Sequence, residues 1–567
     1  MSRYLRYIEQ NEKWRGFKPD RHVIDRFDQN YDVIYDTDDH IPDPDAIRQF
    51  AIAADEGDFD LLYCDEDVIR DHQRTRPYFK PGYSPESERS LGYISGMIAV
   101  RKGLEYEGLY SFKRDRVCHI GKVLYHRRRE RTIPETSGHD PFFDKVHGKI
   151  SVIILTKDHP DMLERCVRSL RASLVTEDAE IVLVDNGSSD GARRRYEEIA
   201  KEHNVSYFHD PSEFNYSELN NFGVSKSSGE ILVFMNDDIE VPESEKGIIE
   251  RMAAAASSDD AGAVGIKLLY PDRERIQHCG ITLLYTGPSH RLQGYRNDAV
   301  YYYGYSDHDI NTIAVTGACL AVRRDRFESV GGFDVKLPVA YNDVDLCMKL
   351  YEAGFDNICM NSHSLIHYEG ATRADDRKDR SAYERLKKEK NYFNSKHRSL
   401  TDGGDPFMNE NFSPYSLDFE INLPYEWELS GYSAVWDTDR KIKVKKRVHG
   451  ALDRVEYRLA DAYGNEDYYE ASGWIFREGF NSFKPCIVME ASGGRYVAEA
   501  FKIRRIDVGE VFPKIRKSAD SGFIARISGV ELEKLGIKDE IIVYPALIKG
   551  RKHMIKGDEE CLKKIKI

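Results

Sequence analysis

An acidic cluster follows an apolar run near the middle of the chain, where Asn236, Asp237 and Asp238 come directly after EILVFM (230–235). Carboxylates at a strand end suit a hard divalent cation, which prefers oxygen ligands and is often shared with substrate phosphates. The alternative is a solvated turn that caps the next helix, because Asn and Asp are ordinary turn residues. The sequence contains neither GxxxxGKS/T nor GxGxxG, so a metal and side chains would have to hold any phosphates.

The elements that position this cluster are apolar runs that alternate with helical patterns. The runs are ISVIIL (150–155), EIVLV (180–184), VSYFHD (205–210) and EILVFM. This alternation predicts right-handed crossovers and a parallel sheet that is buried on both faces. Ligands of such sheets bind beyond the carboxyl ends of the strands. Thr156 and Asp185 end the first two runs, so we expect them to converge with the acidic cluster.

The composition favours several packed domains. The chain has 567 residues, 41 % of them hydrophobic, and a net charge of −14, which predicts three or four domains and disfavours nucleic acid as a partner. No apolar stretch of about 18 residues occurs, so we expect a cytoplasmic protein, with peripheral contact at the membrane face as a further expectation. The nine cysteines show no CxxC spacing, which argues against disulfides and a zinc site.

The two ends of the chain differ in texture from the middle. Short alternating segments such as KIKVKKRV and CIVMEA, separated by turn residues, predict an antiparallel β-sandwich from about residue 405. Near the N-terminus, YDVIYDTDDHIPDPDAI (31–47) parallels ILVFMNDDIEVPESEKGI (231–248). Both segments combine a strand, an acidic cluster, a Pro and a helix, which indicates a diverged internal repeat.

Eight motifs in order carry a family resemblance. Residues 150–396 resemble the inverting family 2 glycosyltransferases with the GT-A fold, particularly the rhamnosyltransferase-like enzymes of bacterial surface polysaccharides. The motifs are ISVIILTKDHPDMLERCVRSL, EIVLVDNGSSD, FNYSELNNFGVSKSSGEILVFMNDDIEV, GAVGIKLLYPD, IQHCGITL, VTGACLAVRRDRFESVGGFD, YNDVDLCMKLYEAGF and LIHYEGATR. The expected fold is therefore a GT-A domain of the Rossmann-like α/β class, with a degenerate GT-A-like unit before it and a β-sandwich after it.

The resemblance implies a donor site and a metal site. The residues that it implies for the nucleotide sugar are Thr156, Asp185, Asn221, Asp237 and Arg373. Asp185 has an alternative role as the cap of the following helix. The implied cofactor is Mn²⁺ or Mg²⁺, held by Asp238 and by His367 of LIHYEG. A purely structural role is the alternative for His367, as for any lone histidine.

The resemblance also implies a general base, because inversion at the anomeric carbon requires deprotonation of the acceptor hydroxyl. Asp343 is the candidate, although the family usually has Glu-Asp where this chain has Asn342-Asp343. Asp345 is the structural alternative in the same helix. The acceptor-side residues implied by the resemblance are Thr316, Gly317 and His278.

The flanking regions carry weaker resemblances. YDTDDHIPDPDAI, FDLLYCDEDVI, PYFKPGYSPES and HIGKVLYHRR match only the later half of a sugar transferase. Residues 1–147 therefore read as a reduced, inactive relative, although Asp36 and Asp38 keep the pattern of a metal site. The segment SGWIFREGFN resembles part of an accessory β module, in which Trp474 would stack on a sugar or belong to the core. Basic stretches at 377–393, 440–447 and from Lys549 would attract anionic lipid or form solvated faces.

These expectations amount to three domains and one leading function. Residues 1–147 would form the reduced unit, 148–400 the catalytic domain and 405–567 the β-sandwich. The leading hypothesis is metal-dependent transfer of a sugar from a nucleotide-diphosphate donor to a surface-polysaccharide or lipid-linked glycan. A glycan-binding scaffold without turnover is the competing hypothesis, favoured by the reduced first unit and Asn342. A nucleotidyltransferase would explain the acidic cluster but not TGACL or NDVDL.

Overall fold

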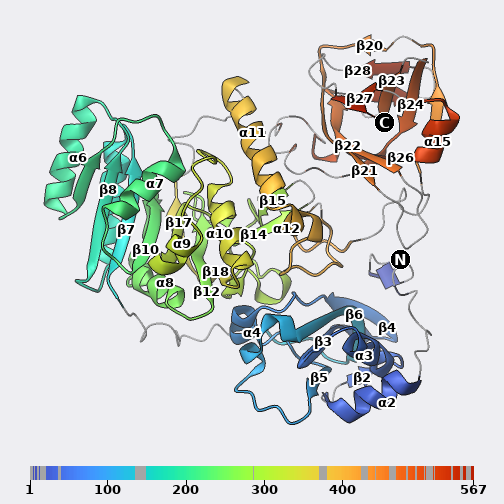
Figure 1. Ribbon diagram of the computed structural model, residues 1–567, viewed down its shortest axis with the longest axis horizontal. Helices are drawn as coiled ribbons and strands as arrows, with labels where there is room; N and C mark the ends of the chain where they lie inside the picture. The colour runs from blue at the N-terminus through green and yellow to red at the C-terminus, as the bar shows by residue number, and fades with distance from the viewer. Residues whose placement is uncertain are drawn as a thin grey trace. The chain divides into compact units, whose positions relative to one another are not determined.

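A computed structural model describes the chain as two compact units, Met1–Ile421 and Asn422–Ile567 (Figure 1). Residues outside the description are 1–3, 6, 9–11, 13–20, 36–39, 134–147, 285–286, 369–379, 415, 423–431, 441, 459–467, 480–482, 492–493, 504, 506–507, 509–511, 513–514, 516–517, 538–539, 550–552, 557–562 and 567. The division differs from the expected boundaries, since residues 1–421 form one unit and the last unit begins at residue 422 instead of 405.

The main sheet of the first unit contains the four expected strands as parallel neighbours. Their bounds are β7 (Ile150–Thr156), β8 (Ala179–Asp185), β9 (Ser206–His209) and β10 (Ile231–Asn236). The sheet continues beyond β10 through β17 (Cys319–Arg323), β12 (Ala261–Leu269), β18 (Asp356–His367) and β11 (Ile239–Glu240). Strand β13 (Ile276–His278) pairs with β12 off this path, and β16 (Ile310–Asn311) pairs with β18.

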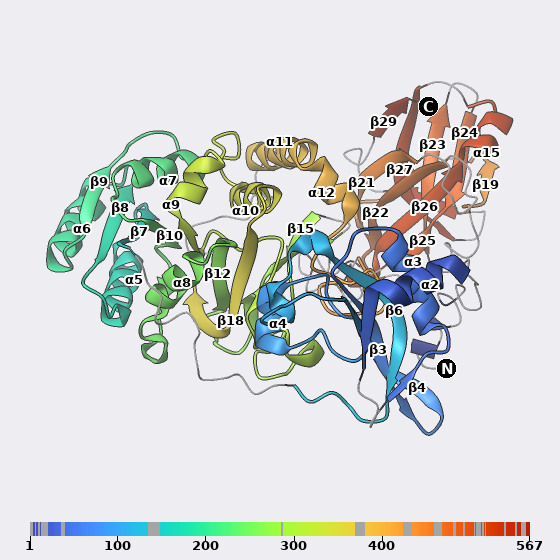
Figure 2. The ribbon, with the colours of Figure 1, turned by 60° about the horizontal axis from the view of Figure 1, so that its bottom comes forward.

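Helices cover both faces of this sheet, which explains why its strands are apolar throughout. One hydrophobic cluster joins the sheet to α5 (Pro160–Ser173), α6 (Asp190–Glu202) and α8 (Ile248–Ala256). A second cluster joins the other face to α7 (Tyr216–Ser225), α9 (Arg324–Ser329) and α10 (Asn342–Glu352). Figure 2 shows the sheet between α5 and α8 on one side and α7, α9 and α10 on the other. The hairpin of β14 (Ile281–Leu284) and β15 (Gly287–His290) forms a separate small sheet.

The N-terminal module, residues 21–127, has a sheet with the same strand order as part of the main sheet. Its elements are α2 (Arg21–Asn30), β1 (Tyr31–Ile34), β2 (His40–Pro42), α3 (Ala46–Asp55), β3 (Leu61–Arg70), β4 (Gln73–Tyr78), α4 (Pro85–Leu91), β5 (Ile98–Arg101) and β6 (Val117–Arg127). The order β1-β5-β3-β6-β2, with β4 beside β3, matches β10-β17-β12-β18-β11, with β13 beside β12. Strand directions also match. Among the compared strand pairs, β3·β6 and β12·β18 are parallel, and the others are antiparallel. This shared topology agrees with the internal repeat.

The described part of the N-terminal module has no counterparts of β7, β8 and β9. Its sheet therefore corresponds only to the part of the main sheet from β10 onward.

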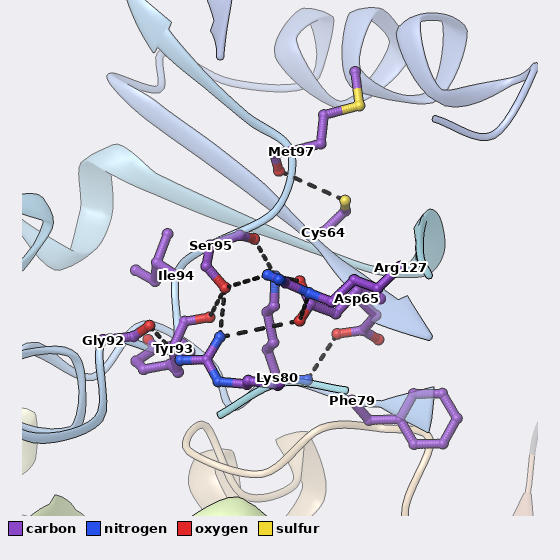
Figure 3. Close-up of polar contacts among 12 residues, drawn as sticks. Cys64, Asp65, Phe79, Lys80, Gly92, Tyr93, Ile94, Ser95, Met97 and Arg127 are labelled. Atoms are coloured by element: carbon purple, nitrogen blue, oxygen red, sulfur yellow. Dashed lines mark hydrogen bonds and ion pairs between the residues drawn. The ribbon is translucent and has the colours of Figure 1, made fainter. Parts of the chain in front are cut away.

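Buried charges fill the centre of the N-terminal module (Figure 3). Strand β3 carries Asp65, Glu66 and Asp67, all at most 1 % exposed, and the side chain of Lys80 is fully buried beside them. The Lys80 ammonium lies 3.2 Å from Glu66 Oε2, and Arg127 Nε donates to Glu66 Oε1 at 2.7 Å. Lys80 N also donates to Asp65 Oδ1 at 2.8 Å, and Arg74 Nε lies 2.6 Å from Asp67 Oδ2. Each carboxylate thus has a positive or hydrogen-bonding partner, as burial of a charge requires.

A connecting segment, residues 405–421, contacts both the N-terminal module and Arg291, which directly follows β15. Asn409 Nδ2 donates to both carboxylate oxygens of Asp65, at 3.0 and 2.9 Å. Farther along, the buried guanidinium of Arg291 donates to the carbonyls of Ser416 and Asp418, at 3.1 and 2.8 Å. These contacts explain why the segment belongs to the first unit. Helices α11 (Arg380–Lys396) and α12 (Arg398–Gly403) lead into it.

The second unit is the predicted β-sandwich. One sheet has the order β19-β24-β23-β27-β28-β20, with β29 on β27, and the other has the order β21-β22-β26-β25. The bounds are β19 (Val435–Asp437), β20 (Lys443–Val444), β21 (Val448–Arg458), β22 (Tyr468–Arg477), β23 (Lys484–Ala491), β24 (Gly494–Glu499), β25 (Phe501–Ile503), β26 (Gly522–Ser528), α15 (Gly529–Lys534), β27 (Glu540–Lys549), β28 (His553–Lys556) and β29 (Lys563–Lys566). One core contains residues of both sheets. Trp474 is half-buried outside that core, with its ring beside Phe476 and Phe512.

The described residues bear on disulfides and on membrane-spanning helices. Eight of the nine cysteines lie in the described part, and none of these forms a disulfide. No helix there has the length and apolar character needed to cross a membrane.

Candidate active site

The carboxyl ends of β7, β8 and β10 meet at one edge of the main sheet, as the sequence predicts. Thr156 and Asp185 are register partners in neighbouring strands, and both are buried. The Thr156 hydroxyl donates to Asp237 Oδ2 at 2.7 Å. Burial, with a smaller contribution from the neighbouring Asp238, raises the pKa of Asp237 to about 7. The three strand ends therefore form a connected group of polar side chains.

His367 lies beside the acidic cluster at the end of β18. It ends β18 and pairs with Ile239 of β11, which brings its ring beside Asp238. Its Nε2 lies 3.1 Å from Asp238 Oδ1, and its Nδ1 contacts Gln277 Oε1 at 2.6 Å. Asp238 Oδ1 is buried and accepts no hydrogen bond in the described structure.

This pair fits a divalent cation shared with a substrate. A buried carboxylate oxygen without a hydrogen bond and an imidazole nitrogen beside it are suitable ligands for Mn²⁺ or Mg²⁺. Among the described residues, no three His, Cys, Asp or Glu side chains are grouped closely enough to hold a metal by themselves. The remaining ligands would therefore come from water and from phosphate oxygens.

Asp343 is held at the first turn of α10. Its Oδ2 accepts a hydrogen bond from Gly317 N at 2.8 Å, and its Oδ1 accepts from Val344 N at 2.8 Å. The hydroxyl of Tyr216 donates to Gly317 O at 2.9 Å. Thr316 completes this turn, where its hydroxyl accepts from Ala318 N at 3.3 Å. The turn before β17 and the start of α10 are thus joined through one carboxylate.

Residues 151–328 match the family model described as Glycosyl transferase family 2. The chain contains a family 2 glycosyltransferase domain. Its fold is GT-A, and the expected fold class is confirmed together with the β-rich second unit. The family match covers β7 to β17 and thus the acidic cluster, whereas Asp343 and His367 lie beyond it.

This chain, with its family 2 domain, is similar to three curated proteins. Protein y4gI of Sinorhizobium fredii is 30 % identical over 463 residues, which cover 70 % of this chain and 50 % of that protein. The O-antigen biosynthesis protein RfbC of Myxococcus xanthus is 30 % identical over 399 residues, covering 59 % and 30 %. An N-acetylglucosaminyl-diphospho-decaprenol L-rhamnosyltransferase of Mycobacterium tuberculosis is 27 % identical over 244 residues, covering 39 % and 76 %. The chain spans half or less of the length of the first two relatives.

Asp345, the second aspartate in the first turn of α10, is held in ion pairs. Asp345 is fully buried, and its Oδ1 lies 2.8 Å from His397 Nε2 and 2.7 Å from Lys396 Nζ. Lys349 Nζ lies 3.2 Å from Oδ2. Burial raises the pKa of Asp345, but the His397 hydrogen bond and the two lysine charges outweigh that effect and hold it below its usual range. Asp345 therefore fastens α10 to α11 and the turn after it.

Asp185, Asn221 and Asn342 form hydrogen bonds with residues near them in the structure. Asp185 accepts from Ser188 N at 3.0 Å and from the Tyr207 hydroxyl at 2.7 Å, in the turn before α6, but the N-cap of that helix is Ser189 and not Asp185. Asn221 uses both ends of its amide on the backbone of Phe333, at 2.9 and 3.1 Å. Asn342 accepts from Asp343 N at 2.8 Å, so the amide that replaces the usual glutamate stabilises the start of α10.

His278 does not face an open site. Its side chain is fully buried, with Nδ1 at 2.8 Å from His290 Nδ1 and Nε2 at 3.8 Å from Cys359 Sγ. Burial and the neighbouring His290 hold the pKa of His278 well below its usual range. The expected direct contact with an acceptor does not fit this burial. Arg373, Asp36 and Asp38 lie outside the described residues.

Sequence reasoning missed Gln277 and Tyr216 as members of the site. Gln277 stands beside His278 in IQHCG, and Tyr216 stands at the start of the NYSELNN segment. Both motifs carried the family resemblance, which was the available signal. Which side chain of each motif faces the site depends on strand register and helix phase.

Proposed function

We propose that residues 148–400 form a metal-dependent inverting glycosyltransferase that moves a sugar from a nucleotide-diphosphate donor to a glycan acceptor. The observation that carries the proposal is the buried Asp238 Oδ1, which lacks a hydrogen bond and lies 3.1 Å from His367 Nε2. Asp238 Oδ1 and His367 Nε2 lie at the carboxyl edge of an α/β sheet, and both can coordinate a cation that also binds diphosphate. The family 2 match makes a nucleotide sugar the expected diphosphate.

The donor would lie across the ends of β7, β8 and β10. Thr156, Asp185 and Asp237 belong to that edge in the structure. We assign Asn221 to positioning the segment around Phe333, because both ends of its amide are used there. Arg373 remains a proposed partner of the diphosphate. When bound, Mn²⁺ or Mg²⁺ would stabilise the charge of the departing diphosphate.

Asp343 would act as the general base. Its carboxylate would take the proton of the acceptor hydroxyl while the hydroxyl oxygen forms a bond to the anomeric carbon and the carbon–oxygen bond to the diphosphate breaks. The hydrogen bonds from Gly317 N and Val344 N fix the orientation of the carboxylate. Thr316 and Gly317 would border the acceptor. We assign His278 no contact with it, because that side chain is fully buried.

The acceptor would be a surface-polysaccharide or lipid-linked glycan, reached at the cytoplasmic face of the membrane. Two relatives support this class, one named an O-antigen biosynthesis protein and the other an L-rhamnosyltransferase for N-acetylglucosaminyl-diphospho-decaprenol. Rhamnosyl or another hexosyl transfer is the corresponding proposal for the donor.

The N-terminal module would not transfer sugar. Its described residues lack counterparts of β7 and β8, the strands that end in Thr156 and Asp185 in the family 2 domain. Without that edge a nucleotide has no binding surface. The module would instead stabilise the domain through the connecting segment, in which Asn409 contacts Asp65.

The test is a screen of UDP-, dTDP- and GDP-sugars with the full chain, with Mn²⁺ or with EDTA. We expect metal-dependent transfer to a lipid-linked acceptor, or slow hydrolysis of one donor. The scaffold alternative, which Asn342 favours, predicts glycan binding without metal-dependent consumption of any donor. That outcome, with folded protein and intact glycan binding, would refute the proposed function.

A further inference from the structure

The two ring nitrogens of His367 face different kinds of partner. On one side, Nδ1 lies 2.6 Å from the amide oxygen of Gln277. On the other side, Nε2 lies 3.1 Å from Asp238 Oδ1 and 3.4 Å from Asn236 Nδ2. His367 and Gln277 are 8 % and 3 % exposed, so water does not compete freely for either contact.

The contact with Gln277 determines which nitrogen carries the hydrogen. An amide oxygen accepts hydrogen bonds but cannot donate one, so Nδ1 must be the donor. A neutral imidazole has one ring hydrogen, and Nε2 is then left with its lone pair. Asn236 Nδ2 can donate only to such a lone pair, which agrees with the same tautomer.

This tautomer leaves two electron-rich atoms face to face. With the hydrogen on Nδ1, no hydrogen stands between Nε2 and the carboxylate oxygen of Asp238, although they are 3.1 Å apart. Asp238 Oδ1 is also without a hydrogen bond. A divalent cation would satisfy both atoms, whereas the opposite tautomer would place a hydrogen between them and occupy both.

Sheet geometry makes Gln277 the residue for this task. Strand β12 lies between β13 and β18, with Leu269 opposite both Ile276 and Ile366. Gln277 and His367 each follow one of these partners. Gln277 is the extra residue of a β-bulge between Ile276 and His278, and a bulge changes the direction of a side chain. His278 contacts His290 and Cys359 instead of His367.

We infer that Gln277 is a positioning residue that holds His367 in its Nδ1–H tautomer and thereby keeps Nε2 ready for the metal of the donor site. The inference rests on the proposed function, since it concerns the same metal. Gln277 has no contact with the substrate in this role. It acts through His367, as outer-shell acceptors commonly do for metal-binding histidines.

The first test needs no substitution. In the metal-free full chain, labelled with ¹⁵N-histidine and compared with His367→Gln for assignment, we expect Nδ1 to be protonated and Nε2 to be bare at pH 8. A hydrogen on Nε2 in that spectrum, whether in the opposite tautomer or in an imidazolium, would overturn the inference.

The second test compares variants by the affinity for Mn²⁺, measured by electron paramagnetic resonance with UDP, dTDP or GDP present. Gln277→Leu removes the acceptor, so we expect the His367 hydrogen to shift to Nε2 and the Mn²⁺ affinity to fall about 10–100-fold. Gln277→Glu keeps an acceptor oxygen and should bind within a few-fold of wild type. Gln293→Leu is the matched control, because Gln293 donates to the Tyr270 hydroxyl elsewhere in this region.

Asp238→Asn separates this inference from the proposed function. If it abolishes Mn²⁺ binding while Gln277→Leu leaves both the affinity and the tautomer unchanged, the metal site stands and the role of Gln277 is refuted. If Asp238→Asn itself leaves Mn²⁺ binding unchanged, the proposed metal site fails, and the role of Gln277 fails with it.

Discussion

Asp343 Oδ2 accepts a hydrogen bond from the backbone nitrogen of Gly317 at 2.8 Å. The contact joins the first turn of α10 to the turn before β17, two places that are separated by 25 residues of chain. A carboxylate held by backbone donors keeps one orientation, which a general base requires. The same geometry makes Asp343 part of the local structure, so its two roles must be separated experimentally.

Asp343→Asn should lower turnover by about 10²–10⁴-fold and leave donor affinity nearly intact. The amide keeps an acceptor oxygen for Gly317 N but cannot take the acceptor proton. Initial rates at saturating donor, with donor affinity from calorimetry, give the two quantities separately. Wild-type turnover would direct the search to another base, and an equal loss of donor binding would make Asp343 structural.

Asp345→Asn should behave in the opposite way. Removing this buried charge leaves Lys349, Lys396 and His397 with weaker partners, and we expect a loss of about 1–3 kcal/mol in the free energy of unfolding. Donor affinity and turnover of the folded protein should stay within a few-fold. Calorimetric unfolding and rate measurements on the same sample test this. A large loss of turnover without a loss of stability would exchange the roles assigned to the two aspartates.

Substituting Asp36 and Asp38 together with Ala should leave transfer within a few-fold of wild type. A carboxylate pair without a nucleotide-binding edge contributes little differential binding of a transition state. Product analysis of the double variant is the measurement. If the folded double variant lost one specific linkage from the product, the N-terminal module would be a second active site.

Glu88→Gln should stabilise the N-terminal module at pH 8 and have little effect near pH 4.5. Burial raises the pKa of Glu88 from 4.5 to about 7. Between these values only the unfolded state loses the proton, so the free energy of unfolding falls as pH rises, by about 3 kcal/mol in all. The amide keeps an oxygen for Ile94 N, which donates to Glu88 Oε2 at 2.6 Å. Calorimetric scans of both proteins at the two pH values are the test, and an equal gain at both would contradict the raised pKa.

Features that depend on local pattern were predictable from the sequence. Apolar runs such as 150–155 and 180–184 predicted the strands β7 and β8. The carboxyl ends of parallel strands meet at one edge of the sheet, which predicted that Thr156 lies near Asp237. Features that depend on distant partners were not predictable. Asn409 contacts Asp65 across 344 residues, and nothing in either local sequence indicates that contact.

The same distinction holds within the candidate site. Asp238 stands out because it follows a strand, but its missing hydrogen bond is visible only in three dimensions. His278 and Gln277 are neighbours in one motif, and the sequence does not indicate the bulge at Gln277, the residue that contacts His367. Asp345 could not be separated from Asp343 by sequence, because its partner His397 lies beyond α11.

The most direct test of the central claim is calorimetry of Mn²⁺-dependent nucleoside-diphosphate binding to Asp238→Ala and wild type. Removing the carboxylate takes away a ligand for which the site has no substitute, so metal-dependent binding should disappear in the variant. Asp272→Ala is a matched control, because Asp272 is a turn carboxylate that pairs with Arg275. We expect metal-dependent binding by wild type and by Asp272→Ala only. Unchanged metal-dependent affinity in Asp238→Ala would contradict it and leave the acidic cluster as a turn.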